Sequence, residues 1–180
     1  ILVAGCGTSQ AAKYALRWPH ARVTGIDISS ASIRETCKLK QKHGIENLEL
    51  RMLPVERATE LKRSFDHVVC TGVLHHLVDP GLGLQALHDV LEPDGAMHLM
   101  VYAPYGRAGV YMLQDYSRRL GIDTTTADIR ELASALSLLP PQHPLVPLLR
   151  SARDFHDQGG LAGALLHPQD PPHSVPALVH

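Results

Sequence analysis

The chain has 180 residues, of which 44% are hydrophobic and 19% are charged, and its formal net charge is −1. This length and composition are typical of a globular protein with one sizeable core. The near-neutral charge provides no basic field for DNA or for a membrane surface, and no apolar run approaches the ~20 residues of a membrane span. We therefore expect neither DNA nor a membrane as a partner.

The cysteines are Cys6, Cys37 and Cys70, which are few, scattered and odd in number. Such usage indicates free thiols in a reducing compartment, and it predicts a cytoplasmic location. The sequence begins inside an apolar run without a methionine, and it stops where a helical pattern begins. We expect a fragment of a longer chain.

Apolar runs and helical patterns alternate over the first hundred residues. Strands are predicted at 1–4, 22–27, 48–52, 65–70 and 96–102. Helices are predicted at 9–18, 29–43, 54–61 and 80–91, with a turn at 93–95. This alternation predicts an α/β fold with a doubly wound, mainly parallel sheet that is covered by helices on both faces.

The pattern changes after Tyr102 and becomes mainly helical. Helical segments are predicted at 105–120, 126–139, 144–150 and 160–166, with Thr126 as the cap of the second. The proline-rich stretch 167–172 cannot be regular structure. We expect two parts, a sheet-containing core at 1–103 and a helical C-terminal region at 104–180.

Two strand ends carry groups that suit a nucleoside-containing ligand. The first strand runs into Gly5-Cys6-Gly7 and then a helix start, where unpaired N–H groups favour an anion. Both glycines lack a Cβ, so we expect both to leave room for the ligand. Asp27 ends the second strand, twenty residues after Gly7. A carboxylate there can bind the ribose hydroxyls. Cys6 is interpreted as a small residue that fills tight space.

Five short motifs occur in an order and at spacings that resemble class I S-adenosylmethionine-dependent methyltransferases, members of the Rossmann-like methyltransferase superfamily. The motifs are Val3-Ala4-Gly5-Cys6-Gly7-Thr8, Gly25-Ile26-Asp27, Phe65-Asp66-His67-Val68-Val69, Val73-Leu74-His75-His76-Leu77 and Leu91-Glu92-Pro93-Asp94-Gly95. The resemblance covers about residues 1–103. It implies S-adenosylmethionine as the cofactor and methyl transfer as the activity.

The resemblance also implies roles for individual residues. Gly5 and Gly7 would lie under the methionine part, Asp27 would hold the ribose, and Ile28 would contact the adenine. The implied cofactor-binding set is Ala4, Gly5, Cys6, Gly7, Asp27, Ile28, Pro54, Val55, Thr71, Val73 and His75.

The chain departs from the family pattern at two places. Ser9 stands where the family has a third glycine. The acid that often follows the third strand is missing, and Glu56 is a candidate substitute. Both departures concern the affinity for the cofactor.

Methyl transfer from a sulfonium is an in-line displacement in which the protein supplies mainly positioning. The weak candidates for a catalytic role are His75, His76 and Tyr102, and we expect the two histidines to shape the site instead of acting as bases. Tyr102, Tyr105 and Arg107 are candidates for binding the methyl acceptor, which the helical region would cover or recognise. The acceptor can be a small molecule, a protein or RNA.

Alternatives to a methyltransferase remain open. An NAD-dependent oxidoreductase would need a glycine where Gln10 stands. A non-catalytic S-adenosylmethionine-binding module of a larger protein would carry the same cofactor motifs. His167, Asp170 and His173 match no known metal-ligand spacing, so we expect no metal site.

Overall fold

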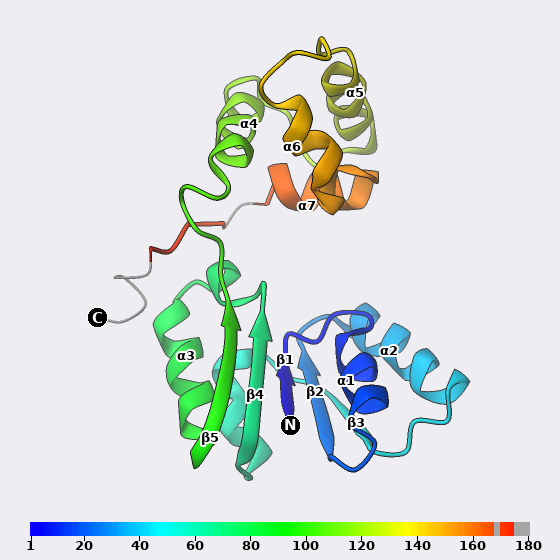
Figure 1. Ribbon diagram of the computed structural model, residues 1–180, viewed down its shortest axis with the longest axis vertical. Coiled ribbons are helices and arrows are strands. Elements are labelled where there is room, and N and C mark those ends of the chain that lie inside the picture. The colour runs from blue at the N-terminus through cyan, green and yellow to red at the C-terminus, as the bar shows by residue number, and fades with distance from the viewer. Residues whose placement is uncertain (168–169, 175–180) are drawn as a thin grey trace. The chain divides into compact units, whose positions relative to one another are not determined.

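The computed structural model describes residues 1–167 and 170–174 (Figure 1). The chain divides into two compact units, Ile1–Val101 and Tyr102–His180. Among the described helices, none combines the length and apolar character needed to cross a bilayer.

The first unit is built on a five-stranded parallel sheet with the order β3-β2-β1-β4-β5. The strands are β1 (Leu2–Ala4), β2 (Val23–Asp27), β3 (Leu48–Met52), β4 (Phe65–Thr71) and β5 (Leu91–Met100). The strand order reverses beside β1, and the carboxyl ends of β1, β2 and β4 meet at one edge. This sheet confirms the predicted doubly wound α/β fold.

Helices cover both faces of the sheet. Helices α1 (Gln10–Arg17) and α2 (Ser30–Lys42) lie on one side, and α3 (Pro80–Asp89) lies on the other (Figure 1). Short 3₁₀ helices follow β3 and β4, namely η1 (Val55–Leu61) and η2 (Leu74–His76). Of these elements, η2 was not predicted.

Strand β1 is buried on both faces because its side chains alternate between two cores. Leu2 and Ala4 belong to the apolar cluster that includes α3, whereas Val3 belongs to the cluster that includes α1. A Cβ on Gly25 in β2 would lie 2.7 Å from the Cβ of Ala11. Small residues at both positions therefore let α1 pack closely against the sheet.

Strand β5 differs from the prediction at its start. The segment 93–95 was predicted as a turn, and a strand was expected only from Ala96. The structure begins β5 at Leu91, and the register shifts between Phe65 and His67 on β4. Leu91 pairs with Phe65 and Ala96 with His67, so the extra residues bulge within the strand. The sheet edge tolerates Pro93 there, because a proline at an edge need not donate to a ladder.

The second unit is helical in its described residues. Its elements are α4 (Ala108–Arg119), α5 (Thr126–Ser137), α6 (Val146–Ser151), η3 (Arg153–Phe155) and α7 (Gln158–Leu165). Helix α4 begins three residues later than predicted, and η3 was not predicted. The cap of α5 is Thr125, whose side chain accepts from the N–H of Asp128, and not Thr126. The helices share an apolar cluster that includes Val110, Leu113, Leu132, Leu161, Ala164 and Leu165.

Candidate functional site

The glycine turn after β1 contains two residues in the left-handed region, Gly5 with φ +67° and Gly7 with φ +55°. A Cβ on Gly5 would lie 2.3 Å from Cγ2 of Val73, whereas a Cβ on Gly7 would meet nothing within 4 Å. The expectation that both glycines leave room for a ligand is therefore wrong for Gly5. The space beside Gly5 is filled by Val73, and only Gly7 faces open space.

Asp27 ties the end of β2 to the glycine turn. Its Oδ2 accepts a hydrogen bond of 2.8 Å from the N–H of Gly7, and its Oδ1 accepts one of 2.8 Å from the N–H of Ser29. A carboxylate has about four lone-pair positions, and these two bonds leave others for a ligand. Because the side chain is half-buried, a pair of ribose hydroxyls can reach it.

The Gly7 peptide is also held from the opposite side. The hydroxyl of Thr36, a fully buried residue of α2, donates to the Gly7 carbonyl at 3.0 Å. Sequence reasoning missed Thr36, because a threonine inside a helix carries no signal that it faces a loop. With Asp27 on the N–H and Thr36 on the carbonyl, the turn is organised before any ligand binds.

At the end of β4, Thr71 contacts the start of α1. The side-chain amide of Gln10 donates to Oγ1 of Thr71 at 2.5 Å. The next residue, Gly72, has φ +75° and leads into the segment that carries Val73. Thr71 was predicted as a site residue. Gln10 was not, because it was considered only as the position at which an NAD-dependent oxidoreductase would need a glycine.

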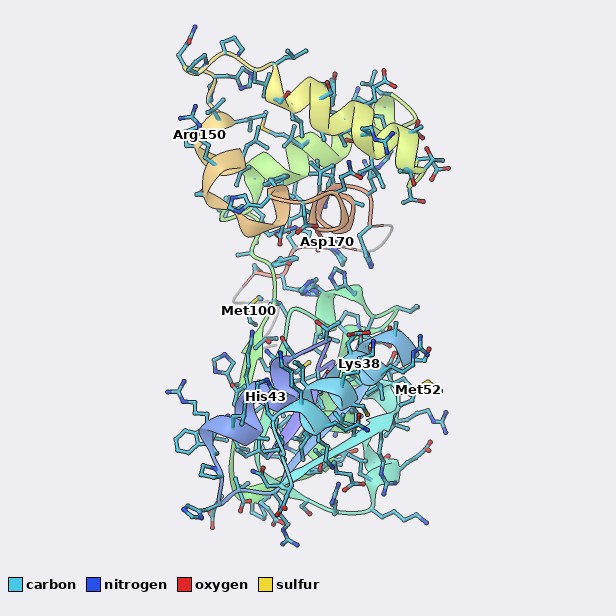
Figure 2. The ribbon with its side chains drawn as sticks, turned by 90° about the vertical axis from the view of Figure 1, so that its right-hand side faces the viewer. Lys38, His43, Met52, Met100, Arg150 and Asp170 are labelled. Atoms are coloured by element: carbon cyan, nitrogen blue, oxygen red, sulfur yellow. The ribbon has the colours of Figure 1, made fainter. Side chains whose placement is uncertain are left out.

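The carboxyl ends of β2 and β3 present apolar side chains. Ile28 is 72% exposed and Met52 is 65% exposed, and Met52 projects outward from the first unit (Figure 2). Met52 was missed, although it pairs in register with Asp27. Pro54 and Val55 both belong to the cofactor-binding set that the resemblance implies. Pro54 is half-buried, while Val55 is 4% exposed and belongs to the core. Glu56 is exposed.

Three further predicted site residues are fully buried in the first unit. Ala4 and Cys6 are fully buried, so only their backbone can meet a ligand. Burial raises the pKa of the Cys6 thiol to about 12, which keeps it protonated and unsuited to nucleophilic attack. His75 is fully buried, and its ring lies edge-on to that of half-buried His76, with 4.2 Å between centroids.

The predicted acceptor residues lie in the second unit, where two of them contact each other. The guanidinium of Arg107 lies 3.4 Å from the centroid of the Tyr102 ring, and its Nη2 lies 3.1 Å from Oδ2 of Asp170. Gln114 donates to the same Asp170 oxygen at 2.9 Å. Burial raises the pKa of Tyr102. Tyr105 is 93% exposed and stands apart from this cluster.

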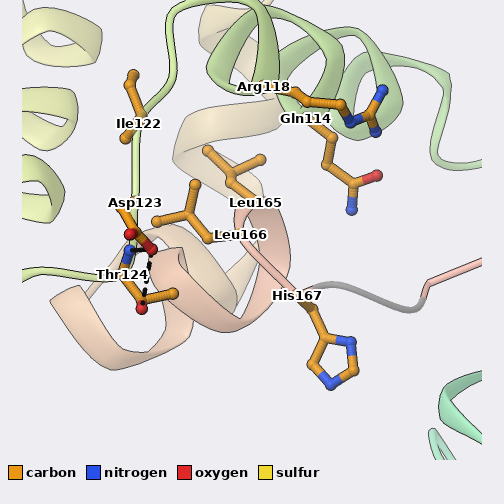
Figure 3. Close-up of a pocket in the computed structure, with 8 residues that line it drawn as sticks. All are labelled: Gln114, Arg118, Ile122, Asp123, Thr124, Leu165, Leu166 and His167. Atoms are coloured by element: carbon orange, nitrogen blue, oxygen red, sulfur yellow. Dashed lines mark hydrogen bonds between the residues drawn. The ribbon is translucent and has the colours of Figure 1, made fainter.

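The second unit also contains a cavity of about 220 Å³ between α4, the loop after it and the end of α7 (Figure 3). It is lined by Gln114, Arg118, Ile122, Asp123, Thr124, Leu165, Leu166 and His167. Its polar groups partly satisfy one another, since Asp123 accepts from the N–H of Thr124 at 2.6 Å. The volume is below the ~300 Å³ at which small-molecule sites begin, so it suits only a small group.

The family match to known proteins falls within the first unit of the chain. Residues 2–97 match a family model described as a methyltransferase domain. The chain is 38% identical over 117 residues to an uncharacterized protein of Synechococcus, covering 64% of this chain and 28% of that protein. It is 34% identical over 99 residues to the ubiquinone biosynthesis O-methyltransferase of Bordetella avium, covering 53% of this chain and 39% of that protein.

Among solved structures, PKMT2 from Rickettsia typhi is similar in fold, with a TM-score of 0.75 and 20% identity over 99% of this chain and 36% of that one. The same protein in complex with AdoHcy gives a TM-score of 0.70 at 21% identity, over 95% of this chain and 35% of that one. The chain thus spans well under half the length of these relatives.

Proposed function

The chain belongs to the family of methyltransferase domains, and on this premise we propose that it binds S-adenosylmethionine and transfers its methyl group to an acceptor. The observation that carries the proposal is the hydrogen bond of 2.8 Å between the N–H of Gly7 and the carboxylate of Asp27. It joins the open glycine turn to the group that would hold a ribose. A glycine turn that can bind an anion would not by itself indicate a nucleoside ligand.

The residues present fit the cofactor. Gly7 faces open space, so the backbone of the turn can approach a ligand closely. Asp27 retains lone pairs for the ribose hydroxyls. Exposed Ile28 and Met52, beyond the ends of β2 and β3, offer apolar contact to the adenine.

The cofactor, when bound, supplies a methyl group already activated by its sulfonium. The protein then has to hold donor and acceptor in line and exclude water. The turn at Gly7 is fixed by Asp27 and Thr36, which limits movement of the donor. His75, fully buried against His76, shapes the site in this proposal. Replacing His75 by alanine should therefore lower turnover without abolishing it.

The second unit is proposed to recognise or cover the acceptor. Tyr102, Tyr105 and Arg107 remain the residues proposed to contact it, and the ion pair with Asp170 supports a role in which Arg107 orients Tyr102. Small molecules, proteins and RNA remain acceptor classes for testing. Free Cys6, Cys37 and Cys70 support a cytoplasmic location.

Calorimetric titration tests the cofactor. We expect heat from S-adenosylmethionine and S-adenosylhomocysteine and none from NAD, because α1 begins with Gln10 where dinucleotide binding needs a glycine. Binding of NAD alone would refute the proposal.

A second experiment separates an enzyme from a binding module. Transfer of labelled methyl to a mixture of small molecules, proteins and RNA would show an enzyme and report its acceptor class. Cofactor binding without transfer to any fraction would favour the module.

A further inference from the structure

The side chain of Gln10 takes no part in the site that the sequence predicts, yet it spans the gap between two strand ends. Gln10 is the first residue of α1, directly after the glycine turn, and Thr71 is the last residue of β4. The amide Nε2 donates to Oγ1 of Thr71 at 2.5 Å. Both side chains are half-buried, so part of each is open to a ligand.

The sheet order places Gln10 and Thr71 on the other side of β1 from Asp27, the residue proposed to bind the ribose. Asp27 ends β2 and Thr71 ends β4, and β1 with its glycine turn lies between them. Neighbouring strands are about 4.8 Å apart, so the two ends are separated by roughly 10 Å. An S-adenosyl ligand with its ribose at Asp27 that extended past Gly7 would therefore have its other end near Gln10 and Thr71.

The pair carries both kinds of hydrogen-bonding group. A primary amide can make about four hydrogen bonds, and the structure describes one for the side chain of Gln10. Its Oε1 and second N–H are available, and the Thr71 hydroxyl still has its own proton to donate because its oxygen is the acceptor. A neutral pair with donors and an acceptor complements a zwitterion, which presents an ammonium and a carboxylate together.

We infer that Gln10, held by Thr71, binds the amino-acid end of the cofactor and distinguishes it from nucleosides that lack this end. Oε1 of Gln10 accepts from the ammonium, and the Thr71 hydroxyl donates to the carboxylate. This inference rests on the proposed function, because it assumes that an S-adenosyl ligand occupies the strand ends.

The test compares two probes, S-adenosylhomocysteine and 5′-methylthioadenosine, which share the nucleoside and the sulfur but differ in the amino-acid end. Affinities are measured by calorimetry for the unaltered chain, Gln10→Leu and Thr71→Val. Gln41→Leu, the same exchange at an exposed position of α2, is the matched control. Both test variants keep the approximate shape of the side chain, and circular dichroism checks that each one is folded.

We expect Gln10→Leu and Thr71→Val to weaken S-adenosylhomocysteine about tenfold or more, since hydrogen bonds to charged groups are lost. The affinity for 5′-methylthioadenosine should change less than about twofold, and Gln41→Leu should change neither. Equal losses of affinity for both probes would overturn the inference and would show that Gln10 only supports the contact between α1 and β4. No loss of affinity for either probe would also overturn the inference. Failure of the unaltered chain to bind S-adenosylhomocysteine would instead overturn the proposed function together with this inference.

Discussion

The N–H of Gly7 and the carboxylate of Asp27 are joined by a hydrogen bond of 2.8 Å, although twenty residues separate them along the chain. The other carboxylate oxygen accepts from the N–H of Ser29, the cap of α2. One side chain therefore fixes the glycine turn, the start of a helix and the group proposed to bind ribose. A change at Asp27 should disturb all three.

Asp27→Asn tests this arrangement. The amide retains one acceptor oxygen, so one of the two backbone N–H groups loses its partner and the charge is removed. We expect the dissociation constant of S-adenosylhomocysteine to rise by about 10- to 100-fold in calorimetry. Asp94→Asn, at an exposed position of β5, is the control and should leave the affinity unchanged. Equal affinity of Asp27→Asn and the unaltered chain would remove Asp27 from the site.

Alanine should mainly reduce stability at Gly5 and mainly reduce ligand affinity at Gly7. Gly5→Ala places a Cβ 2.3 Å from Val73 in a left-handed conformation, so we expect a loss of about 2 kcal/mol or more, or roughly 4–8 °C in Tm. Gly7→Ala meets no atom within 4 Å and should cost only about 1 kcal/mol of strain, while weakening S-adenosylhomocysteine at least about tenfold.

A second substitution identifies the cause at Gly5. In the Gly5→Ala background, Val73→Ala removes the clashing methyl groups and should recover part of the lost Tm. Further destabilisation by Val73→Ala, equal to its effect in the unaltered chain, would show that the two positions are not coupled.

Stability should fall steeply at alkaline pH. Burial raises the pKa of both Cys6 and Cys70 to about 12. The unfolded thiols ionise above about pH 9, whereas the folded ones keep their protons, so the folded state binds more protons from pH 9 to 12. The contribution of the protonated thiols to the free energy of unfolding is complete below pH 9. It is lost as the pH rises to 12, by up to about 1.4 kcal/mol per pH unit for each thiol.

Urea unfolding under reducing conditions measures this slope. Between pH 8 and pH 10 we expect the free energy of unfolding to drop by about 2–3 kcal/mol through the two thiols. The double variant Cys6→Ala/Cys70→Ala should be less stable at pH 8 but should lose less on going to pH 10. Parallel pH profiles for the two proteins would contradict the assignment.

Arg107 should stabilise the second unit whatever the acceptor is. Its side chain is 14% exposed, stacks on Tyr102 and pairs with the 3%-exposed side chain of Asp170. Arg107→Leu leaves a buried carboxylate with less charge compensation, so we expect a loss of about 3 kcal/mol, measured by thermal unfolding. Arg118→Leu removes a 74%-exposed guanidinium beside Asp115 and should cost less than about 1 kcal/mol. Similar small losses in both variants would show that the pair contributes little.

The strand ends could be predicted from the sequence because local signals mark them. Apolar runs locate β1, β2 and β4, and the glycines and Asp27 stand directly after two of them. Parallel pairing then brings these ends together without knowledge of any side-chain contact. The start of β5 could not be predicted in this way, because Pro93 and Gly95 favour a turn and only pairing with Phe65 and His67 extends the strand.

The supporting contacts could not be predicted because they depend on tertiary packing. Thr36 and Gln10 lie on helices, and nothing in their spacing indicates that one faces the Gly7 carbonyl and the other faces Thr71. The same holds for Val73, whose side chain fills the space beside Gly5. Sequence patterns therefore located the residues that are proposed to bind the ligand, whereas the structure was needed to find the contacts that hold those residues in place.

The ion pair between Arg107 and Asp170 joins two residues of the second unit that are sixty-three positions apart in the sequence. During synthesis, Arg107 emerges long before Asp170, and Asp154, whose Oδ2 lies 3.9 Å from Nη1 of Arg107, emerges between them. Of these two ion pairs, the closer one forms only after the segment that carries Asp170 has emerged. A chain that ends before Asp170 would keep only the longer ion pair with Asp154 for this largely buried guanidinium, so its helical unit should be less stable than that of the full chain.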